Sequence, residues 1–258
     1  MPNKYLSKIS SPIKASIIYT ICNFFIKGLN IITLPIFTRI MTPYELGIVT
    51  TFTSWTTLLS VIANLSLNSG SFNIAMLEFK QNREGYQSSV LGLSTISSVM
   101  LIILYLIFFE EINQILGLGT WLVILMLISF VFKPAMDFWL LKQRYEYKYK
   151  LSSLVSLSTT FCATIFSIFA VLTTRNSEIS SYLAEIRLYS SNLIIICVSV
   201  FIYVLIFIRG KTFYNKVYWR FALTTSLPLM IHTLAKHILD VSDKLMISNM
   251  IGKSATGI

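Results

Sequence analysis

Seven stretches of this sequence are long and apolar, and each can cross a bilayer as a helix. A membrane-spanning helix needs about 20 predominantly apolar residues. We predict spans at 15–38, 46–69, 88–109, 120–141, 151–173, 190–208 and 221–246. The sequence therefore predicts an all-α, polytopic membrane protein, and its short connections leave no room for a soluble catalytic domain.

The composition agrees with a membrane protein and excludes two other classes. Charged residues make up 12% and hydrophobic residues 55% of the chain, whereas about 25% of residues are charged in soluble domains. So little charge cannot cover a soluble globule, and so much hydrophobicity excludes a disordered chain. The three cysteines lie in apolar stretches and are odd in number, so we expect no disulfide framework and no cysteine metal site.

The basic residues between the spans are unevenly distributed. Alternate connections, beginning with the N-terminal tail, carry 13 of them: Lys4, Lys8, Lys14, Lys80, Arg83, Lys142, Arg144, Lys148, Lys150, Arg209, Lys211, Lys216 and Arg220. The other connections carry only Arg39, Arg175 and Arg187. Cytoplasmic loops are enriched in Lys and Arg, so we expect a cytoplasmic N-terminus. The net charge of +10 then reflects topology, and we expect no nucleic-acid partner.

Three of the spans carry a polar stripe along one helix face. Side chains recur at helical spacing in the following sets: Ser16, Thr20, Asn23, Lys27 and Asn30; Thr50, Ser54, Thr57, Asn64 and Asn68; Ser153, Ser156, Thr160, Thr164 and Ser167. A single stripe of this kind often packs between membrane helices. Several stripes together favour the lining of one polar, water-accessible cavity.

Charged residues at membrane depth are the strongest candidates for function. Each costs about 2.5–3.5 kcal/mol at a helix centre, so it needs a partner or water. Lys27 lies midway along the first span, and Lys133 and Asp137 are four residues apart in the fourth, where they can pair across one face. In the seventh span, one face carries His232, Lys236, Asp240 and Asp243. The Lys133–Asp137 pair is equally compatible with a structural role, and Asp243 with a position at the membrane interface.

Motifs of soluble enzymes are not found. Gly252-Lys253-Ser254 resembles the end of a P-loop, but Ile247 stands where that motif needs its first glycine. The outer connection 174–189 is too short and too poor in acid–base groups for a membrane-bound polymerase. We therefore expect a protein that is not an enzyme and has neither a cofactor nor a bound metal.

A weak internal repeat relates two segments that are 210 residues apart. Both 39–48 and 249–258 follow a helix with a polar face, and they end in Gly47-Ile48 and Gly257-Ile258. The same offset matches His237 to Lys27. The repeat indicates that the seventh span begins a second copy of the unit begun by the first, as in many transporters.

Two motifs resemble those of a known family. The segment 34–47, Leu-Pro-Ile-Phe-Thr-Arg-Ile-Met-Thr-Pro-Tyr-Glu-Leu-Gly, is similar to the first-helix signature of Wzx-type polysaccharide flippases. Ser226-Leu227-Pro228-Leu229, followed by Asp243-Lys244-Leu245-Met246-Ile247 and Gly257, is similar to the family's seventh-helix motif. These motifs mark the wider superfamily of multidrug, oligosaccharidyl-lipid and polysaccharide exporters.

The resemblance implies a MATE-like architecture of two six-helix bundles around a central cavity. The expected parts are a cytoplasmic tail (1–14), a first bundle (15–208), a basic cytoplasmic linker (209–220) and the first helix of an incomplete second bundle (221–258). Family members have 12–14 helices, so we expect a truncated chain or a partner half encoded elsewhere.

The resemblance also implies a function. Wzx-type proteins move undecaprenyl-diphosphate-linked oligosaccharides across the bacterial inner membrane for O-antigen or capsule synthesis, alongside other polysaccharide assembly proteins. For such an anionic substrate the expected binding residues are Asn23, Lys27, Asn30, Arg39, Lys133 and Lys236. The expected ion-coupling residues are Asp137, His232, Asp240 and Asp243.

Two other functions stay open. A cation-coupled multidrug exporter of the same superfamily should have an acidic, aromatic-lined cavity, whereas three lysines are expected at depth here. The chain is also compatible with an inactive remnant of a flippase.

Overall fold

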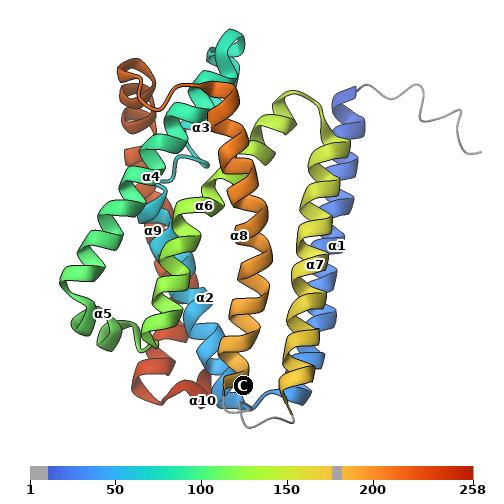
Figure 1. The fold of residues 1–258 in the computed structure, drawn as a ribbon, viewed down its shortest axis with the longest axis vertical. Coiled ribbons are helices and arrows are strands. Elements are labelled where there is room, and N and C mark those ends of the chain that lie inside the picture. Colours follow the sequence, from blue (N-terminus) through green and yellow to red (C-terminus); the bar gives the residue numbers. More distant parts are fainter. Residues whose placement is uncertain (1–10, 176–181, 258) are drawn as a thin grey trace, which may run out of the picture.

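The computed structural model describes residues 11–175 and 182–257, and this part of the chain contains helices and no strands (Figure 1). The elements are α1 (Ser11–Ile40), α2 (Pro43–Ala63), α3 (Ser71–Glu78), the 3₁₀ turn η2 (Lys80–Asn82), α4 (Arg83–Ile107), α5 (Phe109–Leu116), α6 (Thr120–Tyr145), α7 (Tyr149–Thr174), α8 (Leu183–Gly210), α9 (Lys216–Met250) and α10 (Lys253–Thr256).

Six helices of the described chain are long and apolar enough to cross a membrane: α1, α2, α4, α6, α7 and α8. They correspond to the first six predicted spans, and the predicted all-α membrane bundle is confirmed. The predicted seventh span forms part of α9, a helix of 35 residues. This helix is not among the six, because charged and polar residues interrupt its apolar stretches.

Connections rich in basic residues lie at one end of the bundle. The start of α1, the α3–α4 region, the α6–α7 turn and the α8–α9 link all lie at the top of Figure 1. The α1–α2 link, α5 and α10 lie at the opposite end. The strict up-and-down order of the helices therefore agrees with the alternation of basic connections along the sequence.

Local sequence fixes the start of α2. Pro43 is the first helical residue, where a missing N–H costs nothing. The Thr42 side chain accepts a hydrogen bond from the Glu45 N–H, and the Thr42 N–H donates to the Glu45 carboxylate at 2.7 Å. This capping box ends the link from α1 within two residues.

The end of α2 departs from the sequence prediction. The span was expected to reach residue 69, but the helix ends at Ala63. Leu65 and Ser66 adopt positive φ angles of 49° and 51°, which an α-helix does not contain. Residues 64–70 include two asparagines and two serines, whose polar side chains compete with the helix for backbone hydrogen bonds.

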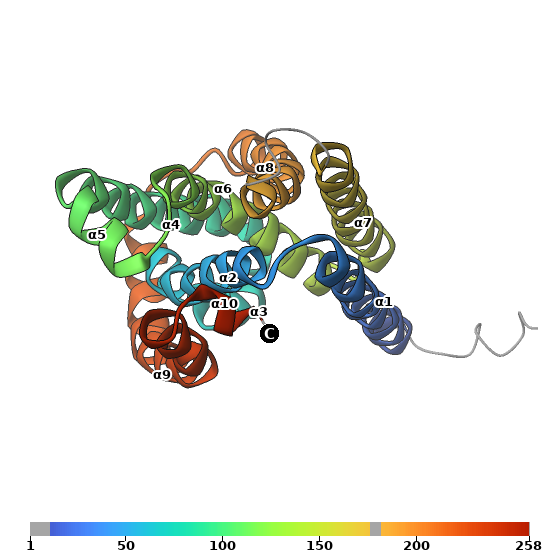
Figure 2. The same ribbon diagram turned by 90° about the horizontal axis from the view of Figure 1, so that it is seen from below.

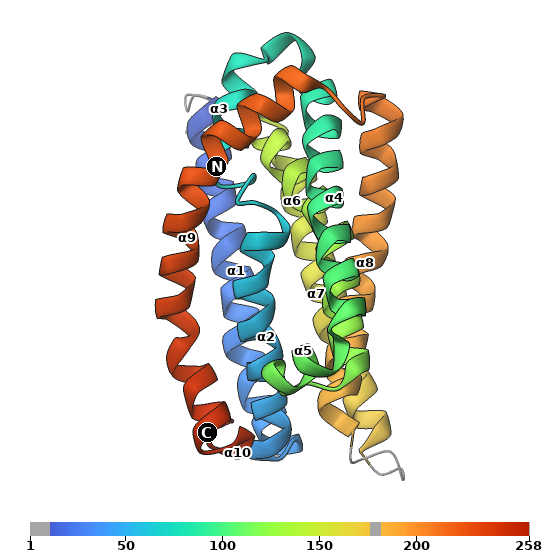
Figure 3. The same ribbon diagram turned by 90° about the vertical axis from the view of Figure 1, so that its left-hand side faces the viewer.

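Aromatic rings attach the first part of α9 to the bundle. The Tyr218 and Phe221 rings make edge contacts with Phe79, with centroids 5.0 and 5.3 Å apart. Trp219 Nε1 donates a hydrogen bond of 2.9 Å to the Ser89 carbonyl of α4. Beyond this anchored part α9 bends, as Figure 3 shows, and Pro228 within the helix removes one backbone hydrogen bond that would keep it straight.

A small ion-pair network stabilises the α6–α7 turn. Lys142 is buried, and its Nζ lies 3.0 Å from Glu84 Oε1 and 3.6 Å from Glu146 Oε1. Lys148 Nζ lies 2.6 Å from Glu146 Oε2. Burial raises the pKa of Glu146, but the hydrogen bond from Lys148 and the charge of Lys142 outweigh it, so the net pKa lies below its ordinary value.

This lowered pKa makes stability depend on pH. The contribution of Glu146 is complete above the ordinary glutamate pKa, about 4.3, and is lost as the pH falls through the lower pKa of the folded state. We expect Glu146→Gln to cost about 1 kcal/mol at neutral pH, a value typical of well-formed, partly exposed pairs. Thermal unfolding in detergent at pH 7 and at pH 3.5 measures this, and the difference between wild type and variant should shrink at the lower pH. An equal difference at both values would contradict it.

Candidate functional site

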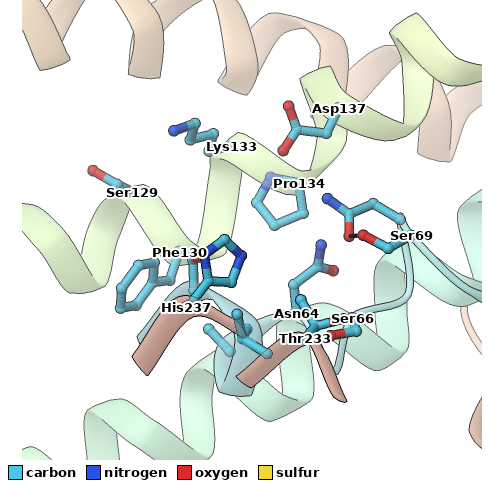
Figure 4. A pocket seen from close by; sticks show the side chains of 14 residues that line it. Asn64, Ser66, Ser69, Ser129, Phe130, Lys133, Pro134, Asp137, Thr233 and His237 are labelled. Carbon is cyan, nitrogen blue, oxygen red and sulfur yellow. Dashed lines mark hydrogen bonds between the residues drawn. The ribbon is translucent and has the colours of Figure 1, made fainter. Parts of the chain in front are cut away.

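A small polar pocket lies between α2, α6 and α9 (Figure 4). The end of α2 and the following turn form one wall, the middle of α6 a second, and Thr233 and His237 of α9 a third. The pocket encloses about 140 Å³. Its side chains belong to Ser60, Val61, Ala63, Asn64, Ser66, Asn68, Ser69, Ser129, Phe130, Lys133, Pro134, Asp137, Thr233 and His237.

Pro134 shapes the α6 wall. Proline has no N–H, so the Phe130 carbonyl four residues earlier loses its helical partner. The Ser98 hydroxyl of α4 donates to this carbonyl at 3.0 Å. The interruption of α6 is thus compensated by a neighbouring helix, as membrane helices require.

The turn after α2 supplies the opposite wall. The Ser94 hydroxyl of α4 donates to Asn64 Oδ1 at 3.1 Å, which fixes the side chain that ends α2. The Ser66 side chain is 2% exposed, and its hydroxyl has no hydrogen-bond partner in the described part of the chain. A buried hydroxyl normally has a partner, so this wall is suited to a bound water or ion.

Lys133 and Asp137 both line the pocket, but they are not paired there. Among the described residues the ion pairs join Lys142 to Glu84 and Glu146, and Lys148 to Glu146. The Lys133 and Asp137 side chains point in different directions in Figure 4, with the His237 ring nearby. Their spacing of four residues allows an ion pair, but no ion pair joins these two side chains in this structure.

The size of the pocket limits what it can hold. Pockets for small organic ligands enclose about 300–1,000 Å³, whereas one water occupies about 30 Å³ of liquid. A volume of about 140 Å³ fits a few waters or a hydrated cation, and it is too small for an oligosaccharide.

The polar stripe of α1 has very different surroundings. All five of its side chains, Ser16, Thr20, Asn23, Lys27 and Asn30, are exposed. Arg39, near the end of the same helix, is also exposed. Lys27 lies about 24 Å from the start and about 20 Å from the end of α1 at 1.5 Å per residue, and it forms no ion pair within the described ranges.

The other two stripes pack partly or wholly against neighbouring helices. Ser153 and Ser167 of α7 are buried, and the Ser167 hydroxyl donates to the Arg187 carbonyl of α8 at 3.3 Å. Ser54 of α2 is buried as well. Helix packing thus accounts for the α7 stripe, whereas the end of the α2 stripe reaches the pocket through Asn64 and Asn68.

The charged face of α9 lies outside the pocket. His232, Lys236, Asp240 and Asp243 are all exposed and do not line the pocket, whereas the neighbouring His237 does. Viewed along the bundle, α9 lies on one side of α2 and the α1–α7 pair on the other (Figure 2). Of the ten predicted site residues, the structure brings only Lys133 and Asp137 together in this pocket.

The two repeat segments contact each other. Ile40 and Met250 end their helices, and Pro43 and Lys253 begin the next ones, in both cases 210 residues apart. A Cβ atom on Gly47 would overlap the Lys253 carbonyl oxygen, and one on Gly257 would overlap the Pro43 carbonyl oxygen. Each glycine thus meets the residue that begins the other helix, and the two contacts are related by the 210-residue offset of the repeat. We refer to it below as the glycine crossing.

A further contact of α9 lies next to the glycine crossing. The Thr51 and Ser248 hydroxyls are 3.0 Å apart and buried. The second half of α9 is thus held against α2, while aromatic rings hold its first part. The pocket lies between these two attachments.

Arg187 is a residue whose position the sequence did not reveal. It was assigned to an outer connection, but α8 begins at Leu183 and includes it. Its guanidinium lies over the Phe37 ring, 3.7 Å from the centroid, and within 3.8 Å of Met41 Sδ. Such cation–π contacts are favoured by arginine, and this one joins the end of α1 to α8.

Comparison with protein families gives one match, which covers nearly the whole chain. A model of the family described as polysaccharide biosynthesis protein matches residues 13–258. The chain belongs to this family. No curated protein and no solved structure matches it significantly. The family and the six apolar helices together make the chain a multi-pass membrane protein of polysaccharide biosynthesis.

Proposed function

We propose that this protein is a flippase, which moves undecaprenyl-diphosphate-linked oligosaccharide units across the bacterial inner membrane for O-antigen or capsule synthesis. Its N-terminus is cytoplasmic in this proposal, because the end that carries the basic connections then faces the cytoplasm. The family membership supports a role with polysaccharide precursors.

The observation that carries the proposal is the exposed, unpaired Lys27 at mid-depth of α1. A lysine there is too costly to face lipid, so its side chain needs water or an anion. The hydroxyl and amide groups of the same face can hydrogen-bond sugars, and the Lys27 ammonium can attract a diphosphate. We assign substrate binding to this face, with Asn23, Asn30 and Arg39, and to Lys133 of α6 and Lys236 of α9.

The pocket has a different role in this proposal. It is too small for a sugar chain, but it contains a carboxylate, an imidazole and an unpartnered hydroxyl. Asp137 is therefore the preferred ion-coupling residue, and its protonation or cation binding would alternate with substrate movement. His232, Asp240 and Asp243 of α9 are further coupling residues.

A test of the function uses a bacterial strain that lacks its own flippase and receives the natural gene. We expect Lys27→Ala to abolish surface polysaccharide and to cause accumulation of the lipid-linked oligosaccharide. The reason is that the diphosphate loses its counter-charge in a low-dielectric site. Lys27→Arg should restore export in part.

Lys211→Ala is the matched control, because Lys211 is an exposed lysine at the end of α8. It should leave polysaccharide display unchanged. Normal display by Lys27→Ala at wild-type abundance would show that α1 does not bind the substrate.

A further inference from the structure

A second cavity lies at the end of the bundle that carries the basic connections. Residues of α4, α6, α7 and α8 and of the α6–α7 turn line it, and none belongs to α2 or α9. It encloses about 510 Å³, within the range of pockets that bind small organic ligands, about 300–1,000 Å³. The cavity is thus separate from the polar pocket and large enough for part of a lipid.

The lining divides into an apolar wall and a polar end. The wall is formed by Val155 of α7 and by Val198, Phe201 and Ile202 of α8. Phe201 is 65% exposed, so the wall continues onto the membrane-facing surface. An acyl chain can therefore lie along it without leaving the bilayer.

Two amide groups at the polar end have no partner. Gln87 and Gln143 are 2% and 4% exposed, and both line the cavity. In the described chain, Gln87 Nε2 and Gln143 Oε1 form no hydrogen bond. Buried amides are almost always paired, so this pair of groups indicates a ligand that offers one acceptor and one donor.

The polar end also has a net positive charge, because its basic side chains outnumber the neighbouring carboxylates by one. The Lys142 and Lys148 ammonium groups face the carboxylates of Glu84 and Glu146. Arg209, at the end of α8, lines the cavity and has no hydrogen bond or ion pair with any described residue. An anionic headgroup is therefore favoured over a zwitterionic one.

From these contacts we propose that the cavity binds an anionic glycerophospholipid of the phosphatidylglycerol type. Its phosphate accepts hydrogen bonds from Arg209 and from Gln87 Nε2, and a headgroup hydroxyl donates to Gln143 Oε1. One acyl chain lies against the apolar wall between α7 and α8. Basic pockets between membrane helices are suited to anionic lipids.

Native mass spectrometry of the purified chain tests this proposal. The protein is incubated with equal amounts of phosphatidylglycerol and phosphatidylcholine that have the same acyl chains, and the bound lipids are counted. We expect phosphatidylglycerol to be retained in preference. Arg209→Gln should lower the ratio of the two lipids about fivefold, the effect of one charge near an anionic headgroup. The control Lys211→Gln should not change it.

Two further measurements separate the parts of the site. Gln143→Leu should remove a preference for phosphatidylglycerol over phosphatidic acid, which lacks the headgroup hydroxyls. Val198→Trp should reduce retention of all lipids by filling the wall, and inorganic phosphate should not displace the lipid. Equal retention of both lipids by the wild type, identical ratios for Arg209→Gln and Lys211→Gln, or displacement by free phosphate would each overturn the proposal.

Discussion

Gly47→Val is expected to separate α10 from α2 and to abolish polysaccharide export. The new side chain would overlap the Lys253 carbonyl oxygen, and backbone cannot yield as a flexible side chain can. Overpacking costs about 1–3 kcal/mol, and each 1.4 kcal/mol is a factor of about ten in an equilibrium. The glycine crossing would therefore open in a large fraction of molecules.

A disulfide between engineered cysteines measures this opening. Thr51→Cys and Ser248→Cys replace hydroxyls that are 3.0 Å apart, in a chain whose own three cysteines are first changed to serine. We expect rapid oxidation in the parent protein and about tenfold slower oxidation with Gly47→Val. The control is Gly28→Val, because a Cβ on Gly28 of α1 meets no atom within 4 Å. Equal oxidation rates for the two valine variants would show that the crossing does not hold the helices together.

The second large effect is expected at Lys133 and Asp137. Both charged side chains line the polar pocket beside the membrane-spanning helix α6. Removal of one leaves the other without an opposite charge in that pocket. Loss of one member of a buried pair costs about 3–5 kcal/mol. Here the groups are not in contact, so we expect about half of that for Lys133→Met and for Asp137→Leu, with a lower amount of folded protein in the membrane.

The double variant Lys133→Met with Asp137→Leu distinguishes a structural role from a functional one. We expect it to recover wild-type abundance, since no unpaired charge is left at membrane depth, but to export less than about one tenth of the polysaccharide. Glu110→Gln, a change at an exposed acid of α5, controls for loss of a carboxylate and should export normally. If the double variant recovered both abundance and export, Lys133 and Asp137 would have only a structural role.

The membrane helices could be predicted from the sequence because their signal is local. Twenty apolar residues in a row have few alternatives in a bilayer, and six predicted spans match six helices. The ends were less accurate: α8 begins seven residues before the predicted start, since Leu183–Tyr189 includes charged residues that a hydropathy argument assigns to a loop. Arg187 belongs to the helix because Phe37 of α1 lies beneath its guanidinium.

The polar pocket was predicted only in part. Lys133 and Asp137 were recognised as charges at depth and His237 only as the repeat counterpart of Lys27. The wall opposite them depends on a turn with two left-handed residues, Leu65 and Ser66. Neither residue type predicts this conformation. The preceding Asn64 side chain accepts a hydrogen bond from Ser94 of α4, which is 30 residues away in sequence. The stripes of α1 and α7 look alike in sequence, and tertiary packing alone decides that the first is exposed and the second is partly covered.

The repeat was found in the sequence, but its geometry was not. Gly47 and Gly257 were noted as the ends of two similar segments, and nothing in their spacing indicated that they touch. The structure shows that these glycines permit a backbone approach that any side chain would prevent.

The absence of side chains at the glycine crossing also determines how that end of the bundle can move. Where two helices meet through long side chains, a gap can widen gradually as rotamers change. Gly47 and Gly257 have no rotamers, so α2 and α10 part only when the helices are displaced as rigid bodies. A gap too narrow for water would leave the Pro43 and Lys253 carbonyls poorly solvated, so partial separation is unfavourable. We therefore expect this end to adopt two discrete states, one with α2 and α10 packed and one with them apart. Transitions between the two should occur on the microsecond-to-millisecond timescale of collective helix motion.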